Sequence, residues 1–169
     1  MSKVIFDHAA VEAALDSMAK AMCADEVYMI GIQRGGALVA DRLQQRLEKS
    51  GCTVYRGDLD ISFYRDDLDT VGPNPEVRPT VLSFDLDAKP LWLVDDVLYT
   101  GRTIRAALGE IFDYGRPASV KLAVLVDRGG RELPVQADMT GLCYEAAAGQ
   151  SVKLDHDGDW QITLRQVKR

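Results

Sequence analysis

The chain has 169 residues, of which 47% are hydrophobic and 27% are charged, and this length fits one domain spanning residues 1–169 with a substantial core. No apolar run approaches the ~20 residues that cross a bilayer, and no basic stretch followed by an apolar one opens the chain, so we expect a cytoplasmic protein without a membrane partner. The net charge of −6 is the opposite of the basic excess typical of proteins that mainly bind nucleic acid.

The first half of the chain predicts alternating helices and strands, with Asp7 as the cap of the first helix and Gly51 as the residue that ends the second. The predicted elements are a helix over 8–23, a strand over 27–32, a helix over 36–49 and a strand over 53–64. Residues 66–80 then combine glycine and prolines with little apolar periodicity, which is typical of a functional lid or a disordered segment.

The second half continues the alternation. The predicted elements are a strand over 91–94, a helix over 101–114, a strand over 120–126 and short strand-like pieces from 129 onward, of which 160–167 is the clearest. Alternating strands and helices predict an α/β fold with a mostly parallel, doubly wound sheet. The three cysteines, Cys23, Cys52 and Cys143, are odd in number and lack CxxC spacing, so we expect reduced, packed thiols.

Residues 93–105 are the most informative segment, because an apolar strand leads there into two carboxylates and then into a turn that begins a helix. The turn, residues 100–103, offers hydroxyls and backbone N–H groups at a helix N-terminus, where an anion is favoured. Asp95 and Asp96 could merely cap a turn, but beside this anion site they are better interpreted as ligands of ribose hydroxyls and of the hydration shell of Mg²⁺. The segment predicts a pocket for a phosphorylated ribose.

Two other segments carry weaker signals for an anion. Arg34, Gly35 and Gly36 follow a strand and would suit a pyrophosphate, although two glycines after a strand are more often a simple turn. Arg65 stands at the start of the presumed lid, where it could stabilise a departing pyrophosphate, or could belong to a solvated charge cluster. A third segment carries a signal for the base instead of an anion: Asp127, with the following Arg128, could line a base-binding edge.

Together these segments resemble the type I phosphoribosyltransferases, and residues 93–105 resemble their signature for 5-phosphoribosyl 1-diphosphate (PRPP). Four motifs narrow the resemblance to the PyrR family, whose members are pyrimidine operon attenuators and uracil phosphoribosyltransferases. These motifs are LDISFYRDDL at 59–68, VDDVLYTGRT at 94–103, YGRP at 114–117 and LAVLVDRGGRELP at 122–134. The resemblance runs in consistent order from about residue 5 to 138.

The resemblance implies the type I phosphoribosyltransferase fold, with about five parallel strands flanked by helices and a small hood formed by the N-terminal segment and about residues 129–169. It implies that uracil and PRPP give UMP and pyrophosphate with Mg²⁺, and it favours a homo-oligomer, a dimer or larger. The implied site comprises Leu93, Val94, Asp95, Asp96, Val97, Leu98, Tyr99, Thr100, Gly101, Arg102, Thr103, Ile104 and Arg105 for PRPP; Arg34, Gly35 and Gly36 for pyrophosphate; Tyr64, Arg65, Asp66 and Asp67 in the lid; Asp127 and Arg128 for the base; and Asp95, Asp96 and Arg65 for catalysis, with both aspartates toward the metal.

The chain departs from this family in the segments that read the base and RNA. Residues 34–36 are nearer to the Arg-Gly-Gly of bacterial purine phosphoribosyltransferases than to the usual Thr-Arg-Gly, which leaves a purine base as an alternative substrate. Gly130 replaces a histidine, Gln136 an arginine, Leu142 a lysine and Asp16 a threonine, so we expect weakened binding of pyr mRNA. Another alternative is a regulator that senses UMP or PRPP and binds this RNA with little turnover.

Overall fold

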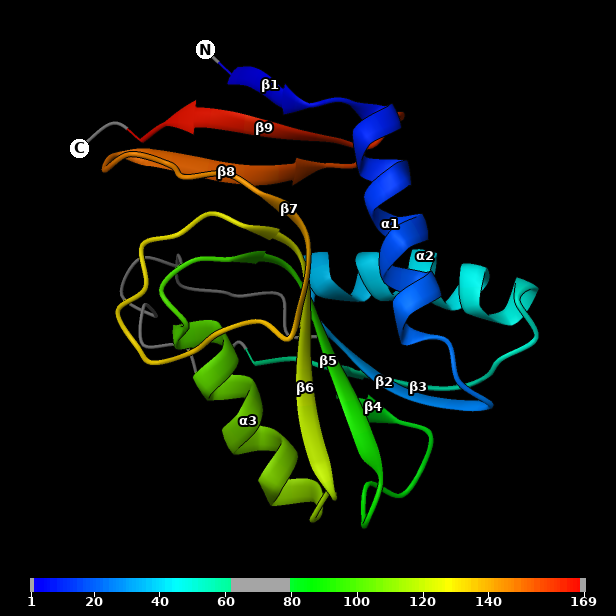
Figure 1. Cartoon of the computed structure of the whole chain (residues 1–169). Coiled ribbons are helices and arrows are strands. Elements are labelled where there is room, and N and C mark those ends of the chain that lie inside the picture. The colour runs from blue at the N-terminus through cyan, green and yellow to red at the C-terminus, as the bar shows by residue number, and fades with distance from the viewer. Residues whose placement is uncertain (1, 62–79, 168–169) are drawn as a thin grey trace.

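The computed structural model describes residues 2–61 and 80–167, which form two sheets and three helices (Figure 1). The larger sheet has the strand order β4-β3-β2-β5-β6-β7 and the smaller one the order β1-β9-β8. The elements are β1 (Ser2–Phe6), α1 (His8–Met22), β2 (Glu26–Ile32), α2 (Gly35–Lys49), β3 (Thr53–Leu59), β4 (Val81–Leu82), β5 (Pro90–Leu98), α3 (Arg102–Tyr114), β6 (Ser119–Asp127), β7 (Met139–Cys143), β8 (Gln150–Asp155) and β9 (Gln161–Gln166).

The larger sheet confirms the predicted α/β fold. Its strands β3, β2, β5, β6 and β7 are parallel, and only β4 runs antiparallel, at the edge beside β3. Helices α1 and α2 cover one face and α3 the other (Figure 1). Because the parallel strands share a direction, the segments that follow β2, β5 and β6 emerge at the same edge.

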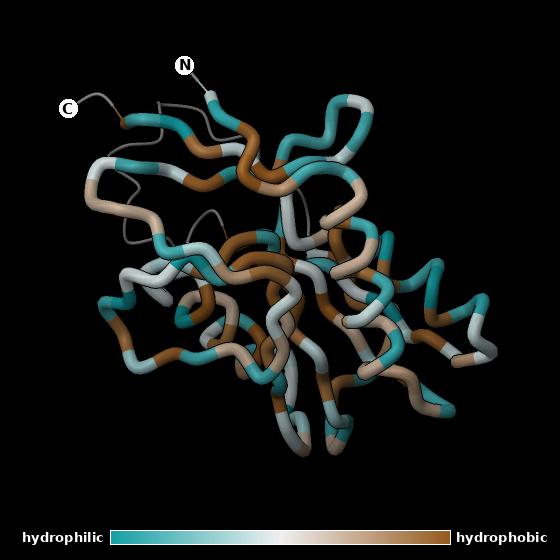
Figure 2. Tube along the Cα trace, turned by 45° about the horizontal axis from the view of Figure 1, so that its top comes forward, coloured by the Kyte–Doolittle hydropathy of each residue, from teal (hydrophilic) through white to brown (hydrophobic). Residues whose placement is uncertain are grey.

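The two faces of the sheet have separate hydrophobic clusters. Leu15 of α1 and Leu43 of α2 lie in one cluster, and Ile104 and Ile111 of α3 lie in the other. Hydrophobic segments accordingly follow the interior strands, while hydrophilic ones follow many of the outer turns (Figure 2). The sheet is thus fixed on both sides, which gives the loops at its carboxyl edge a rigid base.

The smaller sheet is a hood built from both ends of the chain, but it is smaller than the predicted 129–169, because β7 pairs with β6 in the larger sheet. β1 pairs with β9 and β9 with β8, in both cases antiparallel, so β8 forms one edge of the hood. Val152, Ile162 and Leu164 of the hood lie in the same hydrophobic cluster as Leu15 of α1. The hood is therefore packed onto the core through α1.

Two predicted strand ends differ from the structure. β5 continues to Leu98, so Asp95 and Asp96 lie within the strand and not after it. The strand continues because its pairing with β6 continues: Asp95 lies opposite Val124, and Val97 opposite Val126. β3 ends at Leu59, before the predicted end at residue 64.

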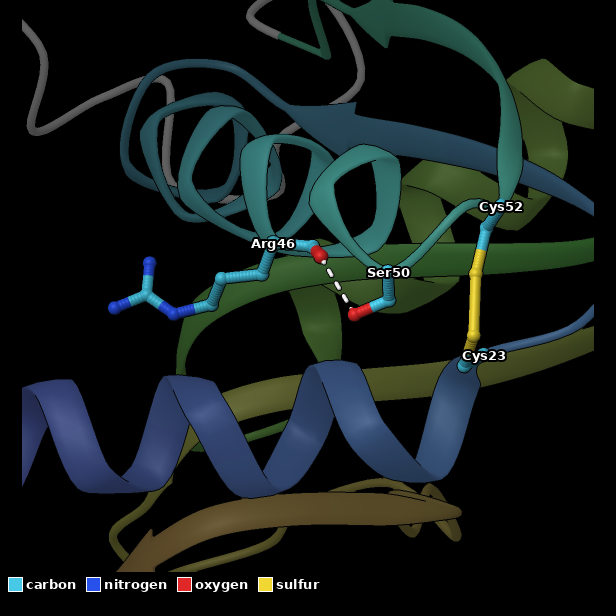
Figure 3. Close-up of a disulfide and its surroundings, with 4 residues drawn as sticks. All are labelled: Cys23, Arg46, Ser50 and Cys52. Atoms are coloured by element: carbon cyan, nitrogen blue, oxygen red, sulfur yellow. Dashed lines mark hydrogen bonds between the residues drawn. A yellow bond between two sulfur atoms is a disulfide. The ribbon is translucent and has the colours of Figure 1, made fainter.

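The prediction of reduced thiols is wrong for two of the three cysteines, because Cys23 and Cys52 form a disulfide (Figure 3). Cys23 follows α1 and Cys52 precedes β3, and their Cα atoms are 6.3 Å apart. This approach comes from the packing of α1 beside α2 and has no local sequence signal. Cys143 is free and exposed. No helix in the described part of the chain is long and apolar enough to cross a membrane.

Candidate active site

A cavity of about 690 Å³ lies where β2, β5 and β6 end, and residues of the hood also line it. The core contributes residues 33–35 after β2, residues 95–104 of β5 and the start of α3, and Arg128 after β6. The hood contributes residues 151–154 of β8. Segments far apart in the sequence thus meet at one place.

The predicted PRPP segment is divided between cavity and core. Residues 95–104 line the cavity. Leu93 and Val94 are fully buried in the sheet, and Arg105 lies on the exposed side of α3, so none of these three lines it. Of the predicted base residues, Arg128 lines the cavity and Asp127 does not. The predicted lid residues, Tyr64, Arg65, Asp66 and Asp67, lie outside the described residues.

The glycines of the predicted pyrophosphate turn pack directly against β5. A Cβ atom on Gly35 would lie 2.2 Å from Oδ2 of Asp96, and one on Gly36 would lie 2.4 Å from the carbonyl oxygen of Val94. The Gln33–Arg34 peptide in this turn is cis, and the Gln33 N–H donates to the Leu59 carbonyl at 2.8 Å. Glycine is therefore required here by the close approach of two chain segments, and that approach places the turn beside the two carboxylates.

The two carboxylates both line the cavity but have different surroundings. Asp95 is 5% exposed, and its Oδ1 accepts a hydrogen bond from the Asp96 N–H at 2.9 Å. Asp96 is half-buried, with its carboxylate beside Gly35. One carboxylate is thus held by the backbone, and the other stands closer to the predicted pyrophosphate turn.

The turn before α3 has the geometry of an anion site. Gly101 caps the helix with φ +92°, a conformation that favours glycine, and the Arg102 N–H donates to Oγ1 of Thr100 at 3.2 Å. The first turn of α3 carries no acidic residue. The positive end of the helix dipole and its backbone N–H groups therefore face a cavity where an anion would be stabilised.

Arg128 is a buried cation in the cavity wall. It is 5% exposed, its Nη1 donates to the Gln150 carbonyl at 2.7 Å, and its guanidinium carbon lies 3.7 Å from the centroid of the Tyr99 ring. Its Nε is buried and has no hydrogen-bond partner among the described residues. A guanidinium carries only donors, so the part of this side chain that lines the cavity favours an acceptor on a ligand.

Sequence reasoning missed the contribution of β8, the edge strand of the hood. The Val167 N–H donates to the Gly149 carbonyl, while the Gln150 carbonyl accepts from Arg128. Since the hydrogen-bonding direction alternates along an antiparallel strand, the N–H and C=O groups of Val152 also turn away from β9. Such backbone groups could pair with a planar ligand, but they have no side-chain signal by which a sequence pattern could reveal them.

Glu110 of α3 is a second buried acid, after Asp95, and Thr80 links it to Asp60. Thr80 Oγ1 accepts from the Asp60 N–H at 3.1 Å and donates to Oε1 of Glu110 at 2.5 Å. Glu110 is 4% exposed, and within residues 2–61 and 80–167 its buried Oε2 has no hydrogen-bond partner. Burial raises the pKa of the Glu110 carboxyl, with smaller contributions from Asp60 and Asp113, and the Thr80 hydrogen bond opposes this rise.

Comparisons with known proteins show which family this chain resembles. Residues 1–157 match the family model described as "Phosphoribosyl transferase domain". The "Bifunctional protein PyrR" of Nitrosococcus oceani is 50% identical over 139 residues, covering 82% of this chain and 78% of that one. The protein of the same description from Elusimicrobium minutum is 42% identical over 173 residues, covering 97% of each chain. A crystal structure of the hypoxanthine phosphoribosyltransferase of Trypanosoma cruzi superimposes with a TM-score of 0.72 at 20% identity, covering 98% of this chain and 97% of that one, which is a likeness of fold.

Proposed function

The chain belongs to the PyrR family of phosphoribosyltransferases, and from this premise we propose that it transfers the phosphoribosyl group of PRPP to uracil. In this reaction, N1 of uracil forms a bond to C1′ of the ribose while the bond from C1′ to the pyrophosphate oxygen breaks. The proton leaves N1, and the products are UMP and pyrophosphate.

The observation that carries the proposal is the meeting of three kinds of chemistry in one cavity: a carboxylate pair, a helix N-terminal turn and a glycine turn beside an arginine. We assign the ribose hydroxyls to Asp95 and Asp96, the 5′-phosphate to residues 100–103, and the pyrophosphate to Arg34, Gly35 and Gly36. These groups act by positioning the reactants and by stabilising charge at the ribosyl centre and its leaving group. Tyr64, Arg65, Asp66 and Asp67 are proposed to cover the reacting centre.

The donor set fits Mg²⁺ bound together with PRPP. The carboxylates of Asp95 and Asp96 are hard oxygen donors at the cavity. Among the described residues, no three or more histidine, cysteine or acidic side chains are grouped so that they could hold a metal ion by themselves. One or two carboxylates completed by substrate oxygens and water is a common arrangement for Mg²⁺. The ion would neutralise charge on the pyrophosphate group. The residues that would hold it are Asp95 and Asp96.

The base is assigned to the part of the cavity lined by Arg128 and β8. A guanidinium has only donors, so it favours a base with a carbonyl oxygen on that edge over one with an amino group. Uracil satisfies this condition, and so do the 6-oxopurines guanine and hypoxanthine. Competition among uracil, guanine and hypoxanthine for PRPP separates these substrates, and turnover of guanine but not uracil would overturn the assignment to uracil.

Steady-state turnover of uracil with PRPP and Mg²⁺ tests the proposal directly. We expect Asp96→Asn to abolish turnover, because it removes a charge at the proposed ribose and metal position. Asp157→Asn is the matched control, since Asp157 is exposed and does not line the cavity. Retention of activity in Asp96→Asn would contradict the proposed role of this residue.

A second candidate function is attenuation of pyr mRNA, which the description "Bifunctional protein PyrR" of the relatives favours. We propose that RNA binding is weak, because the net charge is −6 and Asp16, one of the substituted positions, carries a negative charge and pairs with Arg46. Titration of a leader hairpin with and without UMP, at 50 and 200 mM salt, measures this. Tight, UMP-dependent binding with negligible turnover would establish the regulator in place of the enzyme.

We also propose a homo-oligomer, which light scattering can determine.

A further inference from the structure

We infer that Arg131 is a positioning residue for the phosphate-binding turn, which it holds through a platform formed by residues 127–135. The inference rests on the proposed function, because the turn it concerns is the proposed PRPP site. Arg131 itself is not among the residues that line the cavity. It acts through the backbone of the turn.

Three nitrogen atoms of the Arg131 guanidinium group each donate a hydrogen bond to a different residue. Nη1 donates to the Tyr99 carbonyl at 2.8 Å, Nε to the Val135 carbonyl at 2.9 Å, and Nη2 to Oδ2 of Asp127 at 2.5 Å. The side chain is 24% exposed. The planar fork of an arginine can hold three acceptors in fixed directions, which a lysine cannot. Arg131 therefore ties the two ends of the platform, Asp127 and Val135, to Tyr99, the residue that precedes the proposed phosphate turn.

The platform supports the same turn through four further contacts. The Glu132 and Leu133 N–H groups both donate to the Thr100 carbonyl at 3.0 Å, and the Arg128 N–H donates to the Leu98 carbonyl at 3.1 Å. The Arg102 side chain also pairs with Glu132 at 2.8 Å. Every one of these contacts ends between Leu98 and Arg102, so the platform fixes the backbone that leads into the proposed phosphate turn.

This support has a specific consequence for binding. The turn must present its N–H groups to the phosphate in one arrangement, and a turn already held in that arrangement loses less conformational entropy on binding. Loosening the turn should therefore weaken PRPP binding more than binding of the base, because the Arg128 guanidinium is held separately by the Gln150 carbonyl of β8. A merely structural arginine would lower stability without separating the two substrates.

The test compares Arg131→Ala and Arg131→Lys with Arg46→Ala. Arg46 is a matched control, because it is 18% exposed and also donates to three acceptors, on Asp16, Glu12 and Arg42. It lies on α2 (Figure 3) and does not line the cavity. We expect Arg131→Ala to raise KM and Kd for PRPP roughly 10- to 100-fold with KM for uracil changed less than about twofold, and Arg131→Lys to recover part of the loss. Arg46→Ala should lower the melting temperature and leave KM for PRPP unchanged.

An Arg131→Ala protein with wild-type PRPP affinity would overturn the inference, as would an Arg46→Ala protein with the same loss. Amide hydrogen exchange of residues 98–102 in the ligand-free Arg131→Lys protein gives a second readout, which does not depend on turnover. Faster exchange confined to this turn supports the inference, and unchanged exchange contradicts it. A wild-type protein that binds no PRPP would refute the proposed function, while the exchange measurement would still decide the positioning role.

Discussion

Gly35 and Gly36 are neighbours in sequence, but each is required by a different part of β5. The space that a side chain on Gly35 would need is taken by the Asp96 carboxylate, and for Gly36 it is taken by the backbone of Val94. We predict that Gly36→Ala destabilises the protein by about 1–3 kcal/mol, because backbone cannot move aside. Gly35→Ala should cost less stability but displace the Asp96 carboxylate and weaken PRPP binding. Urea unfolding measures the stability of both variants, and PRPP titration measures their affinity. If the two variants lost the same stability and the same PRPP affinity, the prediction would be contradicted.

Arg128 carries a residue-scale prediction about the base. Arg128→Met keeps an apolar side chain against Tyr99 but removes the donors, so kcat/KM for uracil should fall at least about tenfold, equivalent to 1.4 kcal/mol. Cytosine has an amino group where uracil has a carbonyl, and the preference for uracil over cytosine should therefore shrink. The Kd for PRPP, measured on the same protein, is the internal control. An unchanged ratio of uracil to cytosine turnover would show that Arg128 does not read the base.

The disulfide is a feature of two helices, because it joins the end of α1 to the segment after α2. It closes a loop between two residues separated by 29 positions in the sequence. In the chain-entropy model, a loop of this length lowers the entropy of the unfolded chain and so stabilises the folded protein by about 3–4 kcal/mol. We predict that Cys52→Ser, or reduction of the wild type, lowers the melting temperature by roughly 10 °C. Cys143→Ser is the control, since this thiol is exposed and free, and it should melt like the wild type. Equal melting temperatures for the wild type, Cys52→Ser and Cys143→Ser would contradict the prediction.

The elements also show what the sequence can reveal. The bounds predicted for α2 agree to within one residue, because Gly51, at φ +86°, ends the helix as its type suggests. The true end of β5 could not be predicted, since Asp95 and Asp96 interrupt the apolar run while strand pairing continues beyond them. The cavity wall formed by β8 escaped prediction for another reason: the backbone groups of an edge strand leave no pattern in residue type.

At the scale of the whole molecule, the stability of the protein should depend on pH through Glu110. Its pKa is raised in the folded protein, chiefly by burial, so between its unfolded and folded pKa values the folded chain binds more protons than the unfolded chain. The free energy of unfolding therefore falls as pH rises through this window, which begins near 4.5, the ordinary pKa of a glutamate carboxyl. Below this pH window, Glu110 is protonated in both the folded and the unfolded state, and its contribution to the free energy of unfolding is fully present.

Glu110→Gln removes this ionisation and keeps an oxygen that can accept from Thr80. We predict that the melting temperature of the variant minus that of the wild type increases as the pH rises from about 4 to 7, by about 2–4 °C for each kcal/mol of relieved penalty. Glu145→Gln, at an exposed position, should follow the wild type in parallel across the same range. Thermal unfolding of the three proteins at intervals of pH measures this. A constant difference between Glu110→Gln and the wild type would mean that the burial of this carboxylate carries no proton-linked cost.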